Sequence, residues 1–269
     1  QTEHGFLSFY EHKNELGFIY LDGRKMANKA THDKSHSSMS LRSGSIDRNL
    51  NLNNTQNIDG LVCECCQTDI TVTDKGPIGV YRDRSEEEYR DIYITKLENE
   101  SWSEGKPLHL DNWKINGCPV NGPVITGNNN EITVAWYTRS GGKSNIKVAK
   151  SFDYGETFNE PLLIGTNETV GHISMTTDNK RNTWLLWQKT AKKGLVELVL
   201  SKIEPGSNQI MHKIIEEAGK SPRFSFPQII RNDETIILAY TTVINDSRET
   251  RSSNRKTSIK SLSFNANLY

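Results

Sequence analysis

The sequence predicts an all-β protein, specifically a β-propeller, from three observations. Short apolar runs that end in an aromatic residue recur roughly every fifty residues, as propeller blades do. Turn-forming residues precede each run, and Gly, Asn and Asp suit tight hairpin turns because they tolerate positive φ. No convincing hydrophobic pattern of helical period and length is present. The alternative, a β-sandwich, is less consistent with strands that repeat in groups of about four.

Each repeat contains the same elements in the same order. The turns cover residues 13–15, 74–77, 127–130, 178–180 and 232–234, and the runs that follow them end in a column of aromatic residues. This column, which we expect to lie in the core between blades, is Tyr20, Tyr81, Trp136, Trp187 and Tyr240. After each of the last four runs comes another run in which apolar and polar residues alternate, the period-2 signal of a half-buried strand. We therefore predict five blade units in a single propeller domain, approximately 1–58, 59–115, 116–168, 169–219 and 220–269.

Composition excludes several classes of protein. The chain has 269 residues, and its 33 Lys and Arg balance 33 Asp and Glu. This neutral balance argues against a nucleic-acid-binding protein, which usually carries a basic stripe. The sequence contains no apolar run of the roughly 18 residues that a transmembrane helix needs. Residues 1–20 contain no recognisable signal peptide.

One motif is sharper than the repeat. Residues 151–158 read Ser-Phe-Asp-Tyr-Gly-Glu-Thr-Phe, and five of them match the Asp-box pattern: Ser151, Asp153, Gly155, Thr157 and Phe158. An Asp side chain accepts backbone N–H groups inside a tight turn, and Gly supplies a positive φ. We expect this motif to form the turn between the third and fourth strands of its blade.

With this motif, the chain resembles the BNR/Asp-box repeat proteins of the sialidase-like superfamily. It is most similar to a bacterial group of BNR-repeat, glycosyl-hydrolase-like proteins, with which it shares residues 3–6, 21–24, 63–69, 81–85 and 117–123. The resemblance implies a six-bladed propeller and an exported protein of the periplasm or cell surface. Because only five units are visible, it also implies a sixth blade that is lost, lies upstream of residue 1, or comes from a protein partner.

Four cysteines occupy two neighbouring blade entries: Cys63, Cys65, Cys66 and Cys118. Cys118 can form a disulfide with one of the other three. Alternatively, the thiolates bind a soft metal such as Zn or Cu, with His4 and His172 as additional ligands on the same face. A third interpretation is that they are free buried thiols.

The resemblance also implies a set of catalytic parts. Sialidases bind the substrate carboxylate with arginines, and use a Tyr nucleophile and an Asp acid/base. The candidates in this sequence are Arg82, Arg84, Asp69, Asp83 and Tyr81, with Arg139 and Arg223 as further arginines. The Arg-Ile-Pro motif of sialidases is absent. An alternative is that positions 82 and 83, like their counterparts in other repeats, lie at a solvated strand end. Residues 83–91 would then form a solvated hairpin loop.

Three functions follow as hypotheses. The first is a glycoside hydrolase acting on glycans. The second is a non-catalytic propeller that binds a glycan, a metal or a protein partner at its Cys-rich face. The third is a scaffold within a cell-surface assembly.

Overall fold

The computed structural model describes residues 3–27, 38–192, 195–218, 226–243 and 257–268. They form two compact units, residues 1–143 with 148–161 and residues 144–147 with 162–269. Strands dominate both units, and the described helical elements are the short 3-10 turns η1 (Arg24–Ala27), η3 (Ser140–Gly142) and η5 (Ala266–Leu268). The all-β prediction is therefore confirmed. In the described part of the chain, no helix has the length and apolar character needed to cross a membrane.

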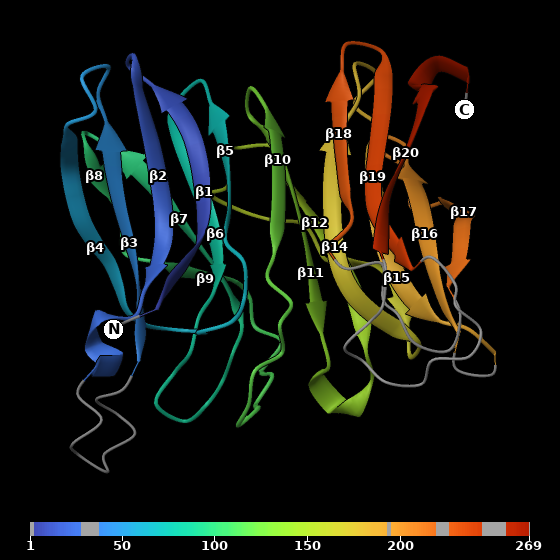
Figure 1. Cartoon of the computed structure of the whole chain (residues 1–269), viewed down its shortest axis with the longest axis horizontal. Coiled ribbons are helices and arrows are strands. Elements are labelled where there is room, and N and C mark those ends of the chain that lie inside the picture. The colour runs from blue at the N-terminus through green and yellow to red at the C-terminus, as the bar shows by residue number, and fades with distance from the viewer. Residues whose placement is uncertain (1–2, 28–37, 193–194, 219–225, 244–256, 269) are drawn as a thin grey trace. The chain divides into compact units, whose positions relative to one another are not determined.

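The first unit consists of consecutive antiparallel sheets (Figure 1). The first sheet contains β1 (His4–His12), β2 (Glu15–Asp22), β3 (Met39–Ile46) and β4 (Leu52–Val62). The second contains β5 (Asp69–Thr73), β6 (Gly76–Arg82), β7 (Ile92–Glu98), β8 (Ser101–Trp102) and β9 (Lys106–His109). The third begins with β10 (Val124–Asn128), β11 (Glu131–Thr138) and β12 (Asn145–Ser151).

The second unit continues the pattern. It contains β13 (Leu162–Thr166), the last strand of the third sheet, followed by the fourth sheet of β14 (Thr169–Thr177), β15 (Thr183–Thr190), β16 (Val196–Ile203) and β17 (Ile210–Ala218). The fifth sheet contains β18 (Gln228–Asn232), β19 (Thr235–Val243) and β20 (Thr257–Asn265). Each predicted repeat thus contains most of one antiparallel sheet, but the predicted boundary at residue 58 is wrong, because β4 of the first sheet continues to Val62. The strands of each sheet follow sequence order, except that β8 and β9 both pair with β7. A sixth blade stays a prediction.

Three residues of the aromatic column pack between sheets, as expected, whereas Tyr20 is only half-buried. Tyr81 lies in the core between the first and second sheets, Trp136 between the second and third, and Tyr240 between the fourth and fifth. These three side chains are at most 4% exposed. Each polar atom has a partner: the Tyr81 hydroxyl donates to Asp59 Oδ2 at 2.7 Å, and the Trp136 indole donates to Asp111 Oδ2 at 2.8 Å. Burial of the rings and satisfaction of their polar atoms together stabilise the stack of sheets.

The predicted turn at residues 151–158 forms after β12, the third strand of its sheet. Asp153 accepts the backbone N–H groups of Glu156 and Thr157 at 3.1 and 2.9 Å, together with the Thr157 hydroxyl at 2.6 Å. These bonds hold the pKa of Asp153 far below its usual value. Gly155 has a φ of 75°, and Phe158 packs against the core between the second and third sheets.

The topology places most candidate residues of the first unit at one end of its sheets. Because each sheet is an antiparallel meander, the links from second to third strands and from one sheet to the next all emerge at the same end (Figure 1). Residues 21–24, 63–69, 81–85 and 117–123 all lie in or beside these connections. We call this edge of the first unit the loop end.

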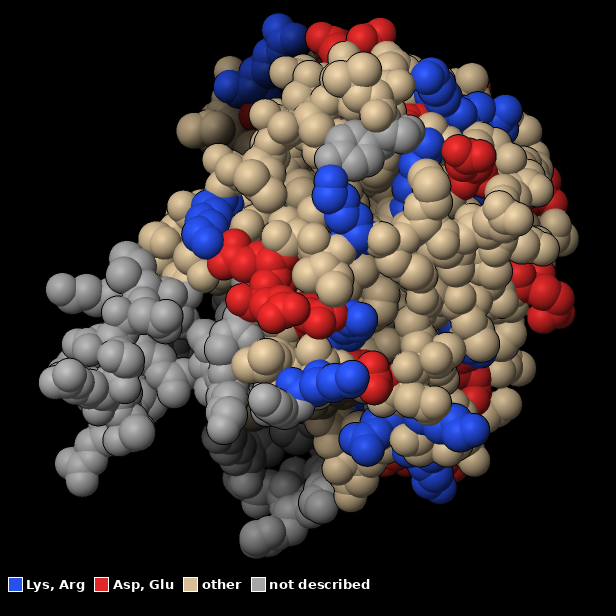
Figure 2. All heavy atoms as spheres, turned by 90° about the vertical axis from the view of Figure 1, so that its right-hand side faces the viewer, with Lys and Arg blue, Asp and Glu red and all other residues tan. Residues whose placement is uncertain are grey.

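Charged side chains of both signs are interspersed on the face shown in Figure 2. This distribution matches the equal numbers of basic and acidic residues in the chain.

Candidate functional site

The cysteines join two loops of the loop end. Cys65, in the link between β4 and β5, forms a disulfide with Cys118, in the link between β9 and β10, and their Cα atoms are 6.0 Å apart. The prediction that Cys118 pairs with one of the clustered cysteines is confirmed. The two loops also approach closely at Gly122, whose N–H donates to Gln67 Oε1 at 2.9 Å, and a Cβ at Gly122 would clash with the Gln67 backbone.

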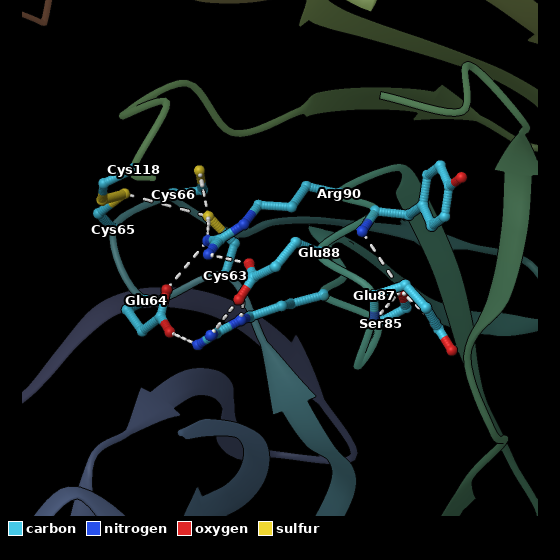
Figure 3. Close-up of polar contacts among 11 residues, drawn as sticks. Cys63, Glu64, Cys65, Cys66, Ser85, Glu87, Glu88, Arg90 and Cys118 are labelled. Carbon is cyan, nitrogen blue, oxygen red and sulfur yellow. Dashed lines mark hydrogen bonds and ion pairs between the residues drawn. A yellow bond between two sulfur atoms is a disulfide. The ribbon is translucent and has the colours of Figure 1, made fainter. Parts of the chain in front are cut away.

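Cys63 and Cys66 remain thiols and are buried, with 1% and 2% exposure. Their sulfur atoms are 2.9 Å apart, and Cys63 Sγ lies 4.0 Å from Cys65 Sγ (Figure 3). The hydrogen bond from the Cys66 thiol lowers the pKa of Cys63 to about 6, with help from the guanidinium groups of Arg82 and Arg90. Burial raises the pKa of Cys66. Cys63 is therefore a thiolate at neutral pH beside a protonated Cys66.

These sulfur atoms also bear on the predicted metal site. Cys63, Cys65 and Cys66 place their sulfurs within 4.8 Å of one another. Cys65, however, is bonded to Cys118, which leaves two thiols in the group. Zn or Cu binding stays a prediction for the fully reduced chain.

An ion-pair network surrounds the Cys63 thiolate (Figure 3). Arg90 approaches Cys63 Sγ at 3.3 Å, and its two terminal nitrogens also pair with Glu64 at 3.0 Å and Glu88 at 2.9 Å. Arg84 pairs with the same two carboxylates. The prediction that residues 83–91 form a solvated hairpin loop is therefore wrong at both ends, because Asp83, Arg90 and Asp91 are buried.

Arg82 and Tyr81, two of the predicted catalytic residues, are buried and hydrogen-bonded to other parts of the chain. The Arg82 guanidinium is 2% exposed and donates to the backbone carbonyls of Asn121, Arg90 and Tyr137 at 3.0, 2.6 and 2.6 Å. The alternative of a solvated strand end is wrong for the same reason. Tyr81 is fully buried, and this burial raises the pKa of its phenol far above the usual value. A buried, strongly protonated phenol is a poor nucleophile.

Asp83 lies beside a second carboxyl group, that of Asp59. Burial, and then the neighbouring Asp59 charge, raise the pKa of Asp83 from 3.8 to about 7. Asp59 in turn accepts the Tyr81 hydroxyl, and Tyr93 hydrogen-bonds Asp83. Asp83 therefore keeps its proton up to about neutral pH, because ionisation would place a second buried charge beside Asp59. An acid/base role for Asp83 stays a prediction, since its side chain has only 9% exposure.

We expect the raised pKa of Asp83 to make stability depend on pH. Between about pH 4 and pH 7 the folded chain keeps a proton on Asp83 that the unfolded chain has released, so stability falls as pH rises through this window. The neutral variant Asp83→Asn should raise the free energy of unfolding at pH 8 by about 4 kcal/mol and change it little at pH 4. Urea denaturation at both pH values measures this difference. Asp74→Asn, at an exposed position of the same sheet, is the matched control, and an equal pH slope in wild type and Asp83→Asn would contradict the expectation.

Asp69 links two sheets. Its carboxylate accepts the N–H of Ile125 on β10 and that of Ile70, both at 2.8 Å, and burial raises its pKa to about 6. Ser8 in the first sheet and Ser174 in the fourth sheet lie at the strand positions that correspond to Asp69 in the second sheet. Each of these serines also forms a hydrogen bond with the first strand of the following sheet or with the link that leads to that strand. Because the contact recurs at equivalent positions, we infer that Asp69 holds the second and third sheets together.

A second charged cluster lies at the start of β1 and the end of β2. Asp22, which is fully buried, accepts ion pairs from His4 Nδ1 at 3.2 Å, Arg24 Nε at 2.5 Å and Arg42 Nε at 3.5 Å. The His4 and Arg24 side chains are 44% and 57% exposed. We call these four residues the Asp22 cluster. Asp22 orients the side chains of the other three residues of the cluster. Because the cluster contains two guanidinium groups and one carboxylate, it carries a net positive charge at the surface.

The remaining candidates lie apart from these groups. His172, on β14 of the second unit, stacks on Phe226 with ring centroids 4.8 Å apart. Arg139 is exposed at the start of η3, and Arg223 lies outside the described residues. A metal site shared with His172 stays a prediction.

Sequence reasoning missed several residues of the loop end: Asp22, Arg24, Arg42, Asp59, Glu64, Glu88 and Arg90. The sequence contained a signal for four of these residues. Asp22 and Arg24 lie in the shared stretch 21–24, and Glu88 and Arg90 lie in the run of mixed charge after β6. Asp59 gave no signal, because it is an isolated acid within a polar strand.

Comparisons with known proteins show similarity in structure and none in sequence. No family model matches the chain, and no curated protein matches its sequence. A protein of unknown function from Dyadobacter fermentans has a TM-score of 0.61 and 13% identity, over 89% of this chain and 75% of that chain. The catalytic domain of a GH62 α-L-arabinofuranosidase from Coprinopsis cinerea has a TM-score of 0.50 and 9% identity, over 99% and 92% of the two chains. A Podospora anserina α-L-arabinofuranosidase has a TM-score of 0.50 and 9% identity, over 97% and 90%.

At these identities the similarity shows the fold alone. The chain is an all-β propeller of the kind found in glycoside hydrolases.

Proposed function

We propose that this chain is a glycoside hydrolase that binds and cleaves an acidic glycan at the Asp22 cluster. The observation that carries the proposal is the set of ion pairs on one buried carboxylate, which holds two arginines and a histidine together at the surface. Preorganised side chains of this kind lower the entropic cost of binding. Surplus positive charge favours a glycan that itself carries a carboxylate.

The four side chains have different capacities. Guanidinium groups stay protonated and present a planar fork that matches a carboxylate, so Arg24 and Arg42 are suited to bind the acidic sugar. Asp22 is buried and cannot reach a ligand. Histidine is a common acid/base group in enzymes, and the imidazole of His4 is half exposed. We assign proton transfer at the glycosidic bond to His4, with Asp22 as its positioning residue.

Two further parts of the proposal rest on other observations. The hydrogen-bonded turn around Asp153 supports membership of the BNR/Asp-box, sialidase-like proteins. The Cys65–Cys118 disulfide supports an exported protein, because disulfides persist mainly in oxidising compartments.

The proposal predicts separate effects of two substitutions. His4→Gln should lower kcat by about 10²- to 10⁴-fold with a smaller change in KM, the usual loss on removing an acid/base group. Arg24→Met should mainly weaken binding of the acidic glycan. Release of reducing ends from a panel of acidic and neutral glycans measures turnover, and calorimetry measures binding. Arg48→Met, at an exposed arginine between β3 and β4, is the control.

The outcomes distinguish catalysis from binding. Equal behaviour of Arg24→Met and wild type, or no affinity for acidic glycans, would refute the site. Affinity without turnover identifies the second candidate function, a non-catalytic glycan-binding propeller. That candidate is favoured by one observation: most glycoside hydrolases use two carboxyl groups at the scissile bond, whereas the Asp22 cluster contains one.

A further inference from the structure

The four cysteines differ sharply in their access to solvent. Cys118 is exposed and Cys65 is half-buried, whereas Cys63 and Cys66 are almost completely buried. The sulfur of Cys63 lies between the two pairs, 2.9 Å from Cys66 Sγ and 4.0 Å from Cys65 Sγ (Figure 3). A buried dithiol therefore lies within contact distance of a disulfide whose other end reaches the surface.

The surroundings of Cys63 favour its nucleophilic form. The guanidinium of Arg90 approaches Cys63 Sγ at 3.3 Å, and the Cys66 thiol donates a hydrogen bond to it. Arg84 and Arg90 both pair with the carboxylates of Glu64 and Glu88, which hold the Arg90 guanidinium against the sulfur. The thiolate is the form that attacks disulfides.

We propose that the four cysteines form a thiol–disulfide exchange site, in which one disulfide moves between the exposed Cys65–Cys118 pair and the buried Cys63–Cys66 pair. In the first step Cys63 Sγ attacks Cys65 Sγ. The Cys63–Cys65 bond forms, the Cys65–Cys118 bond breaks, and Cys118 leaves as a thiolate that takes a proton from water.

In the second step Cys66 Sγ attacks Cys63 Sγ. The Cys63–Cys66 bond forms, the Cys63–Cys65 bond breaks, and the Cys66 proton passes to the departing Cys65 sulfur. The two steps exchange bonds without net oxidation or reduction. They place two thiols, Cys65 and Cys118, where small thiols and disulfides from solution can reach them. A small-molecule disulfide such as oxidised glutathione can then close Cys65 and Cys118 again, and is itself reduced to two thiols.

Alkylation of the folded protein tests the exchange. The full chain with its single disulfide is incubated at pH 7 with N-ethylmaleimide, quenched in acid, digested with pepsin at low pH and mapped by mass spectrometry. We expect label on Cys65 and Cys118 together with a Cys63–Cys66 bond, because alkylation traps the exposed thiols as they form. Label confined to Cys63 and Cys66, or no label with Cys65–Cys118 intact, would overturn the proposal.

Two serine variants separate the steps. Cys63→Ser removes the attacking sulfur, so Cys118 should stay bonded to Cys65 and unlabelled. Cys66→Ser should stop at the Cys63–Cys65 bond and give label on Cys118 alone. Label on Cys118 in Cys63→Ser at the wild-type rate would show that Cys63 is not the nucleophile. Circular dichroism confirms that each variant is folded. In a further comparison, Arg90→Lys, which keeps the positive charge without the guanidinium fork, should retain more of the wild-type labelling rate than Arg90→Met.

Discussion

Removing the Cys65–Cys118 disulfide is expected to lower the free energy of unfolding by about 4 kcal/mol. The bond joins residues 53 positions apart and closes a loop that contains all of the second sheet. A crosslink of this span restricts the unfolded chain strongly, and the chain-entropy relation gives a value of this size. Cys118 is exposed, so the substitution of its side chain removes little packing.

The double variant C65S/C118S is the appropriate test, because a single substitution leaves a partner that can pair with Cys63. Guanidinium denaturation of wild type and of the double variant measures the difference. Wild type in a reducing agent should lose the same amount, whereas the double variant should be insensitive to reduction. A loss below about 1 kcal/mol would show that hydrogen bonds such as that of Gly122 to Gln67 already hold the two loops together.

The second large effect is expected at Arg82. Replacing this buried guanidinium by methionine should cost about 3–5 kcal/mol, because three backbone carbonyls lose a charged donor and remain buried. The carbonyls belong to three separate segments, at Arg90, Asn121 and Tyr137. Arg82, at the end of β6, therefore holds the β6–β7 link, the β9–β10 link and strand β11 of the third sheet together.

Two controls give this expectation its specificity. Arg82→Lys keeps the charge but has no fork to reach all three carbonyls, so it should recover only part of the loss. Arg139→Met, at an exposed arginine of the same unit, should change stability by less than about 0.5 kcal/mol. Denaturant unfolding at one pH measures all three variants. Equal stability of Arg82→Met and Arg139→Met would contradict the assigned role.

Local patterns account for what could be predicted from the sequence. The five repeats follow from alternation and turn residues, which are properties of short segments. The turn at residues 151–158 is equally local, because Asp153 bonds groups within four residues of itself. The spacing of the repeats also brought Cys118 beside residues 63–66, since equivalent positions on successive sheets are neighbours in space.

The candidate site could not be predicted to the same depth. Whether Cys63, Cys65 or Cys66 pairs with Cys118 depends on the path of a short loop, and the sequence left all three open. Arg82 and Asp83 are adjacent in sequence, yet they take part in different groups, because side chains alternate between the two faces of a strand. Their partners, at residues 59, 121 and 137, come from other sheets and loops.

The sequence by itself determined the class of fold, the number of visible sheets and the proximity of the cysteines, because each follows from a short pattern or its repetition. Only the tertiary structure decided that Arg82 binds carbonyls, that Asp22 holds His4 and Arg24 at the surface, and that Cys63 lies beside a disulfide. Contacts such as Asp22 to His4 and Arg82 to Tyr137 join residues 18 and 55 positions apart, and which side chains meet across such distances is fixed by the packing of the sheets.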